Sequence, residues 1–338
     1  MSLESGSPTD NLAPIATWED TQVSLEAVAQ TVERLRAKGD RTASRTSVVN
    51  LVIVADDSES AERTAAAMRR LGARHPGRTI LIRREPEGPA RLDAKVALYE
   101  ATAEGHQIWW EEISLGVSGP AAEHLDSVVI PLVLLHLPVA CWFPSDLPQP
   151  DDPLARACHY LLVDSRFAAP LGAPPGKEKA LRRLLELCGR HLVIDLSWKR
   201  LSPWRELLAS FFDIPSLSPW AKQVTSAHVA AQPGPRSLLA GWLVSRLGLE
   251  AGQLSLEDAL HASIELRSGG DKAVFCVRRS ADLKSVEATA SVEGRVVATQ
   301  EVELVEHALT WSLAQALSRL GRDRFYEEAL EAATRGLW

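Results

Sequence analysis

This chain of 338 residues lacks the short motifs that commonly hold a phosphate group or a catalytic nucleophile. It contains neither G-x-G-x-x-G nor G-x-x-x-x-G-K-[ST], so the Rossmann and P-loop modes of nucleotide binding have no support. It also lacks G-x-S-x-G and H-E-x-x-H, which mark many serine hydrolases and zinc proteases. The sequence therefore favours a protein that is not an enzyme.

Cysteine is also scarce. The four cysteines form no C-x-x-C pair, and no histidine or cysteine stands at zinc-ligand spacing from them. An unpaired cysteine packs as a small hydrophobic side chain. We therefore expect buried, unpaired thiols and no metal or cofactor. The four are Cys141, Cys158, Cys188 and Cys276.

Three further features bear on the compartment of the protein and on its class of partner. The longest apolar run, residues 128–143, is interrupted by Pro131, His136 and Pro138 and is too short to span a membrane. The N-terminus has neither a basic start nor an apolar core, so we expect no signal peptide and a cytoplasmic protein. The net charge of −7 and the pI near 5.8 disfavour nucleic-acid binding.

The composition that remains is that of a globular protein. Hydrophobic residues make up 46% of the chain and charged residues 24%, which is enough apolar material for a large core. The length predicts two domains. Tryptophan is unusually frequent, at ten residues against three tyrosines. We expect most of these indoles in the core and two or three at a contact surface.

The first part of the chain reads as alternating strands and helices. Residues 1–17 form a disordered lead in this interpretation. Strands at 48–55 and 78–84 enclose a helix, with Asp56-Asp57-Ser58 as its cap, which is the spacing of a parallel crossover. Residues 90–103 and 106–115 predict a hairpin through Glu104-Gly105. The other expected elements are helices at 21–38, 125–135 and 178–190 and strands at 138–143, 158–165 and 192–197.

The second part changes character. A strand at 223–230 and a helix at 236–247 precede an antiparallel meander between residues 261 and 304, and two helices end the chain. The predicted fold is α/β: a mixed, largely parallel sheet flanked by helices, then a smaller α+β part with the meander. The domains expected are 18–215 and 216–338, after the lead at 1–17.

The stretch around residues 192–213 is the most informative in the chain. A short apolar strand ends in Asp195, and Trp198, Lys199 and Arg200 follow. Ser202-Pro203 then predicts the start of a helix with a hydroxyl cap. Trp204 begins an apolar stripe in that helix, continued by Leu207, Leu208 and Phe211. Ligands and partners of open α/β sheets gather at the carboxyl ends of strands, so this junction is a candidate working surface.

The acidic residues offer little for catalysis. Glu111 and Glu112 are adjacent on a predicted strand and point to opposite faces, so they form no two-carboxylate site. Asp195 is the one acid with two open interpretations. As a structural group it bonds local N–H groups or pairs with an arginine, and as a catalytic group it serves as a general base. We favour the structural role.

Two segments resemble the OpcA family, the glucose-6-phosphate dehydrogenase assembly proteins. The family carries a D-L-P-V-x-x-W-W-like segment and, some 50 residues later, a D-L-x-W-x-R-x-x-x-W-R segment. The first is matched by Leu137, Pro138, Val139 and Trp142, and the second by Asp195, Leu196, Trp198, Arg200, Trp204 and Arg205. The resemblance covers residues 47–213 and is thin beyond. His136 and Phe143 depart from the pattern, replacing an aspartate and the second tryptophan.

This resemblance implies a non-catalytic protein that binds glucose-6-phosphate dehydrogenase, aids its oligomeric assembly and modulates its activity in the oxidative pentose phosphate pathway. Trp and Arg are the side chains most enriched at interface hot spots. We therefore place the expected contact on a face with Trp198, Lys199, Arg200 and Arg205. The loop at 142–148 flanks it and contributes Trp142, Pro144 and Asp146.

Two alternatives remain at this point. The chain is an enzyme or binding protein for a small phosphorylated sugar if Lys199, Arg200 and Arg205 hold a phosphate. The cluster is instead an internal latch if Arg200 and Arg205 pair with Asp195 and Asp213. An exposed tryptophan–arginine patch favours the protein partner, a cationic pocket favours the phosphorylated sugar, and ion pairs closed within the fold favour the latch.

Overall fold

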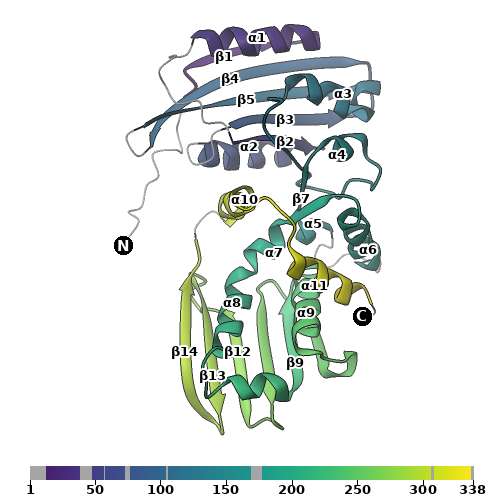
Figure 1. Cartoon of the computed structure of the whole chain (residues 1–338). Helices are drawn as coiled ribbons and strands as arrows, with labels where there is room; N and C mark the ends of the chain where they lie inside the picture. Colours follow the sequence, from purple (N-terminus) through teal and green to yellow (C-terminus); the bar gives the residue numbers. More distant parts are fainter. Residues whose placement is uncertain are drawn as a thin grey trace. The chain divides into compact units, whose positions relative to one another are not determined.

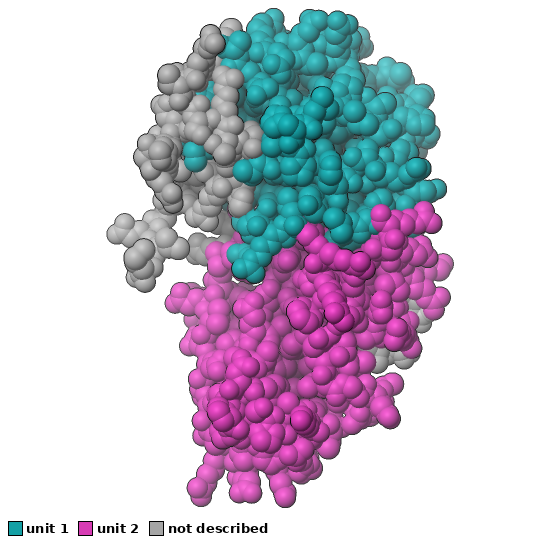
Figure 2. All heavy atoms as spheres, in the orientation of Figure 1, with its two compact units in different colours: residues 1–163, 191–193, 313–320 teal, residues 164–190, 194–312, 321–338 magenta. Residues whose placement is uncertain are grey.

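The computed structural model describes residues 13–38, 48–56, 58–72, 77–103, 106–168, 177–305 and 308–335. Most of the expected lead at 1–17, the cap residue Asp57 and the turn at Glu104-Gly105 lie outside these residues. The chain forms two compact units, coloured separately in Figure 2. Unit 1 comprises residues 1–163, 191–193 and 313–320, and unit 2 comprises residues 164–190, 194–312 and 321–338.

An eight-stranded mixed sheet is the first layer of the fold (Figure 1). Its strand order is β1-β4-β5-β3-β2-β6-β7-β8. The strands β5, β3, β2, β6 and β7 form a parallel run in this order. Strand β4 pairs antiparallel with β1 on one side and with β5 on the other. The expected mixed, largely parallel sheet is thus confirmed. The strands are β1 (Ala16–Asp20), β2 (Val49–Ala55), β3 (Gly77–Glu85), β4 (Arg91–Ala103), β5 (His106–Ser118), β6 (Val139–Trp142), β7 (Tyr160–Val163) and β8 (Leu192–Asp195).

Strand β2 has the nearly continuous apolar sequence of a buried parallel strand. Every residue of its VNLVIVA sequence is buried, as expected for a strand at the centre of a sheet with helices on its faces. Helix α1 (Leu25–Lys38) packs on β4, and α2 (Ser58–Gly72) packs on β2 and β3. The hairpin β4–β5 has the predicted pairing, from Arg91 opposite Ser118 to Ala103 opposite His106.

Two sequence expectations for unit 1 change. Strand β1 was not predicted, because its five residues have no period of their own and are ordered by pairing with β4. The helix expected at 125–135 is shorter: α3 (Leu125–Val129) continues as a 3-10 turn at Ile130–Leu132, and Val133 is extended. The other short helices here are a 3-10 turn at Gly119–Glu123 and α4 (Pro153–Ala157).

Unit 2 is built on a six-stranded sheet in the order β10-β9-β11-β12-β13-β14. Only β10 and β9 are parallel, and the remaining pairs form the predicted antiparallel meander. The strands are β9 (Val224–Ala231), β10 (Leu254–Asp258), β11 (Ser263–Ser268), β12 (Ala273–Arg279), β13 (Ser285–Val292) and β14 (Arg295–Glu303). Strand β10 was not predicted, because its short pattern is exposed and it is ordered by its parallel neighbour.

Helices cover this sheet. Helix α8 (Ser202–Phe211) packs on β12, β13 and β14, while α11 (Arg324–Thr334) packs on α9 (Pro233–Leu247) and α6 (Lys177–Cys188). Gly241 permits the approach of α9 to α11, because a Cβ there would lie 2.0 Å from the Ala329 carbonyl oxygen. The remaining helices are α5 (Ser165–Ala168), α7 (Leu196–Arg200), α10 (Ala308–Ser318) and 3-10 turns at Ser218–Gln223 and Ala251–Gln253.

The boundary expected between residues 215 and 216 falls inside unit 2. The reason is the apolar stripe of α8, which belongs to the core of the second sheet. Its residues Trp204, Leu207, Leu208 and Phe211 are all buried, as predicted. The Phe211 ring lies 6.0 Å from the Phe275 ring of β12. The helix therefore belongs with the meander rather than with the strands that precede it in sequence.

Candidate functional site at the ends of two neighbouring strands

Two buried aspartates mark the carboxyl ends of neighbouring strands. Asp164 follows β7, and Asp195 is the last residue of β8. Both are almost fully buried, at 3% and 1% exposure. Sequence analysis singled out Asp195 and missed Asp164. The signal was nonetheless present, because each strand ends in an aliphatic residue, an aspartate and a nearby serine.

Asp195 caps helix α7 and binds two other parts of unit 2. Its Oδ1 accepts hydrogen bonds from the backbone N–H of Ser197 at 2.8 Å and of Ser165 at 3.2 Å, and Oδ2 accepts one from the Tyr326 hydroxyl at 3.3 Å. Burial, reinforced by the charge of Asp164, raises its pKa from 3.8 to about 6. A group enclosed in this way cannot reach a substrate proton without opening the structure. These contacts are the kind that the structural interpretation of Asp195 expects.

Asp164 is the partner of Arg200. The Arg200 Nη2 donates to Asp164 Oδ1 at 2.6 Å and to Ser197 Oγ at 2.9 Å. The Ser197 hydroxyl in turn donates to the same Asp164 oxygen at 2.7 Å. The latch hypothesis expected Arg200 on Asp195. The arrangement is latch-like, but the anion is the aspartate of the neighbouring strand.

Trp198 lies inside this cluster and is 1% exposed. Its Nε1 donates to Asp323 Oδ2 at 2.9 Å, and Asp323 also caps helix α11. The Arg205 guanidinium lies 3.4 Å above the indole ring and donates to the Trp198 carbonyl at 2.9 Å. A cation–π contact with the ring and a hydrogen bond to the carbonyl thus fix Arg205 on Trp198.

Burial shifts the pKa values of two side chains around Trp198. Burial lowers the pKa of Arg205 to about 10, with Asp323 opposing the shift. Burial, with the nearby Asp195 charge, raises the pKa of Tyr326 well above its usual value. Lys199 Nζ lies 3.9 Å from Asp323. Asp213, the other expected latch anion, is on the exposed surface after α8.

The remaining predicted site residues have separate environments. Trp142 is 2% exposed and Pro144 is buried, whereas Asp146 is exposed and its Oδ1 accepts from the Leu147 N–H. Trp204 is buried, and its Nε1 donates to the Ala262 carbonyl at 2.8 Å. Ser202 does not cap α8: it is the first helical residue, and its hydroxyl accepts from Arg205. The indoles of Trp142, Trp198 and Trp204 therefore stabilise the interior.

The acid pair of β5 behaves as its position predicted. Glu111 forms ion pairs with Arg78 at 2.6 Å and with Arg36 at 2.9 Å. Glu112 is buried on the other side of the strand, and burial raises its pKa. The two carboxylates serve different environments, so they offer no joint acid–base chemistry.

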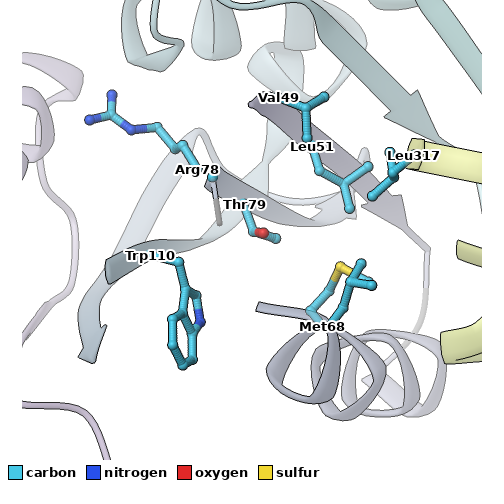
Figure 3. A pocket seen from close by; sticks show the side chains of 9 residues that line it. Val49, Leu51, Met68, Arg78, Thr79, Trp110 and Leu317 are labelled. Atoms are coloured by element: carbon cyan, nitrogen blue, oxygen red, sulfur yellow. The ribbon is translucent and has the colours of Figure 1, made fainter. Parts of the chain in front are cut away.

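A small gap beside these residues holds no ligand-sized space. It has a volume of about 10 Å³ and lies between β2, β3, β5, α2 and Leu317. Figure 3 shows Met68, Leu51 and Leu317 around it, with the Arg78 guanidinium extending away. A space of this size accommodates about one water molecule. It is a packing gap.

No side-chain cluster in the described part of the chain suits a metal ion: groups of three His, Cys, Asp or Glu ligands are absent there. The four cysteines are all unpaired, as expected. Cys141 is buried, and burial raises its pKa well above the usual value. The other three are half-buried, which is more accessible than expected.

Comparison with known proteins decides the family. The N-terminal domain model of the glucose-6-phosphate dehydrogenase subunit matches residues 68–186, and the C-terminal domain model matches residues 191–330. The chain belongs to the OpcA family. The second match extends the family likeness through the last third, where the sequence motifs were thin.

Curated OpcA relatives support this membership. The OxPP cycle protein OpcA of Synechococcus elongatus is 26% identical over 217 residues, which is 60% of this chain and 47% of that protein. The OpcA of Nostoc punctiforme is 30% identical over 192 residues, covering 52% of this chain and 39% of that one. The matches span less than half the length of these relatives.

A solved structure resembles the chain at a low level. It is described as glucose-6-phosphate 1-dehydrogenase from Mycobacterium avium and has a TM-score of 0.47 at 12% identity, over 86% of this chain and 91% of that one. A likeness this weak says nothing about activity. Among the described residues, every helix is too short or too polar to cross a bilayer.

Proposed function

We propose that this chain is a non-catalytic accessory subunit that binds glucose-6-phosphate dehydrogenase, promotes its oligomeric assembly and modulates its activity. The observation that carries the proposal is membership of a family described as subunits of that enzyme, over residues 68–186 and 191–330. The curated relatives are named as proteins of the OxPP cycle, which agrees with this partner.

The polar cluster of unit 2 supports a non-catalytic role. Asp195 and Asp164 are enclosed, and their oxygens accept bonds from serines, Arg200 and Tyr326 of the same unit. Trp198 bonds to Asp323 and stacks under Arg205. These hydrogen bonds within the fold order the junction between strand and helix.

The contact surface is better sought on exposed apolar residues than on the buried indoles. Leu135 is 87% exposed and Ile130 is 48% exposed, in the segment that leads into β6. Pro131 and His136 are exposed beside them. Leu132 between them is buried, so the exposed apolar side chains flank it. Exposed apolar side chains of this kind are found at protein–protein contact sites. We assign this segment, residues 130–136, to the dehydrogenase contact. Asp146, which belongs to the same unit, is exposed and is the proposed polar contribution.

The test mixes the purified chain with the dehydrogenase of the same organism. Light scattering after size-exclusion chromatography measures complex mass, and initial rates measure modulation. Leu135→Asp should weaken the complex about tenfold, because a carboxylate replaces an apolar anchor. Val296→Asp is the matched control, because it makes the same kind of change at an exposed apolar residue of β14. It should bind as the wild type does.

The two parts of the proposal fail separately. If the wild-type chain changes neither the mass nor the rate of the dehydrogenase, the accessory role is wrong. If the wild-type chain binds and Leu135→Asp binds as tightly, the role stands and the assignment of residues 130–136 is wrong. Circular dichroism of each variant establishes that it is folded.

A further inference from the structure

A pocket of about 150 Å³ opens within unit 2, and Ser197 and Arg200 of the polar cluster are among its lining residues. Its walls come from α5, α7, the start of α8 and α9, the end of β9, the loop after β10 and the end of β12. Arginines from three separate elements line it: Arg166, Arg200 and Arg279. His261 is the fourth basic residue. No short sequence motif contains this set, because its members are spread over more than a hundred residues.

The pocket carries excess positive charge. No carboxylate is among its lining side chains in the described part of unit 2. Asp164 lies behind it and pairs with Arg200 at 2.6 Å and with Arg166 at 3.7 Å. Three guanidinium groups thus line the pocket, and Arg279 forms no ion pair with the described residues. The lining is therefore positive in character, which suits an anion.

Hydrogen-bond donors remain for such an anion. Arg279 uses Nε and Nη2 on the Leu283 carbonyl, at 3.0 and 2.8 Å, and its Nη1 faces His261 Nδ1 at 3.4 Å. Arginine cannot accept a hydrogen bond, so this contact requires Nδ1 as the acceptor and leaves the His261 proton on Nε2. Arg279 therefore keeps one N–H on each terminal nitrogen for an anion, whereas Arg200 Nη1, which has no hydrogen-bond partner among the described residues, is buried.

One wall of the pocket is apolar. It consists of Leu201, Trp204, Pro235 and Ala262, with the 64% exposed Leu260 at the side. Pockets for cofactor-sized ligands usually measure about 300 Å³ or more, so this one is too small for a dinucleotide. It suits a phosphate group joined to a few carbon atoms.

We propose that this pocket binds a small phosphate monoester. An arginine guanidinium can donate two parallel hydrogen bonds to phosphate oxygens, and a monoester supplies both the negative charge and an organic part for the apolar wall. The cation set differs from the one suggested by the sequence: Arg200 lines the pocket, whereas Lys199 and Arg205 do not. The inference concerns the chain alone and does not depend on the proposed dehydrogenase partner.

The experiment is isothermal titration calorimetry on the full chain. The probes are glycerol 3-phosphate and ribose 5-phosphate, with inorganic phosphate, glycerol, ribose and sulfate at matched ionic strength for comparison. We expect saturable one-to-one binding of a monoester, tighter than inorganic phosphate and absent for the uncharged sugars. Arg279→Gln should weaken it about tenfold, since it removes a charged donor.

Arg278→Gln is the matched control. Arg278 is the preceding residue of β12 and is exposed, where it pairs loosely with Glu287 at 3.9 Å. Its variant should bind the ester as the wild type does. If Arg279→Gln does not fold, His261→Ala provides the same comparison.

Three results would overturn the inference. One is the absence of saturable binding by either ester at millimolar concentration. The second is equal binding by inorganic phosphate or sulfate, which would mean that the apolar wall is not used. The third is undiminished ester binding by folded Arg279→Gln and His261→Ala proteins.

Discussion

Replacing Asp195 with asparagine should make the protein more stable at neutral pH. The folded-state pKa of Asp195 is about 6, against an ordinary 3.8, because burial and the Asp164 charge disfavour its ionised form. Asparagine keeps an oxygen for the N–H groups of Ser165 and Ser197. Its amide can donate to the Tyr326 hydroxyl, so the buried hydrogen bonds survive while the charge is removed.

The sign follows from proton linkage. The folded state binds the Asp195 proton more tightly than the unfolded state, so this group favours folding most below pH 4. That contribution is lost as the pH rises through 6. A shift of about two pKa units corresponds to roughly 3 kcal/mol. Asp195→Asn should therefore exceed the wild type by about 2–3 kcal/mol in unfolding free energy at pH 7.5, and the gain should shrink to below about 1 kcal/mol near pH 4.5.

Urea unfolding at pH 4.5, 6.0 and 7.5, followed by circular dichroism, measures the difference between the two proteins at each pH. Acids remote from residue 195 titrate alike in both proteins, so the difference reports on the charge at this position. Asp195→Ala is the control: it removes the acceptor, leaves two buried N–H groups unpaired and should destabilise the protein at every pH. A difference between wild type and Asp195→Asn that stays constant across this range would refute the reasoning.

Three further predictions concern the interior. Trp204→Ala should lower the unfolding free energy by about 3–5 kcal/mol, because it removes a buried indole and its bond to Ala262; an unchanged melting temperature would contradict this. Arg200→Glu should lower the unfolding free energy by about 3–5 kcal/mol, since it places a carboxylate beside Asp164. Denaturant titration measures the loss, and a variant as stable as the wild type would show that the pair is not structural. Cys141 should resist a thiol reagent until the protein is denatured, because burial raises its pKa and shields it; labelling in the native state at the rate of a free thiol, read by mass spectrometry, would contradict this.

The sequence by itself determined most helices and strands of both units. Periodicity is a local property, and it placed α8 with its buried stripe, the largely apolar β2 and the antiparallel meander. The β4–β5 hairpin was predicted for the same reason, because two patterned runs joined by a short polar turn favour pairing with each other. The family followed from two short motifs whose order and spacing survive in the chain.

Only the tertiary structure decided what the junction after β8 does. A tryptophan between charged residues reads equally well as an exposed anchor or a core residue, because apolar periodicity stops at the end of a strand. Trp198 is buried since Asp323, 125 residues away in the sequence, accepts its N–H, and since Arg205 covers its ring.

The same limit applied to the charges and to the pocket. Which aspartate pairs with Arg200 depends on strand order, and strand order is a property of the assembled sheet. Arg166 and Arg279 line one pocket although 113 positions separate them in the chain. Side chains brought together from several elements have no common pattern in the sequence, so their chemistry emerges only when the sheets and helices have packed.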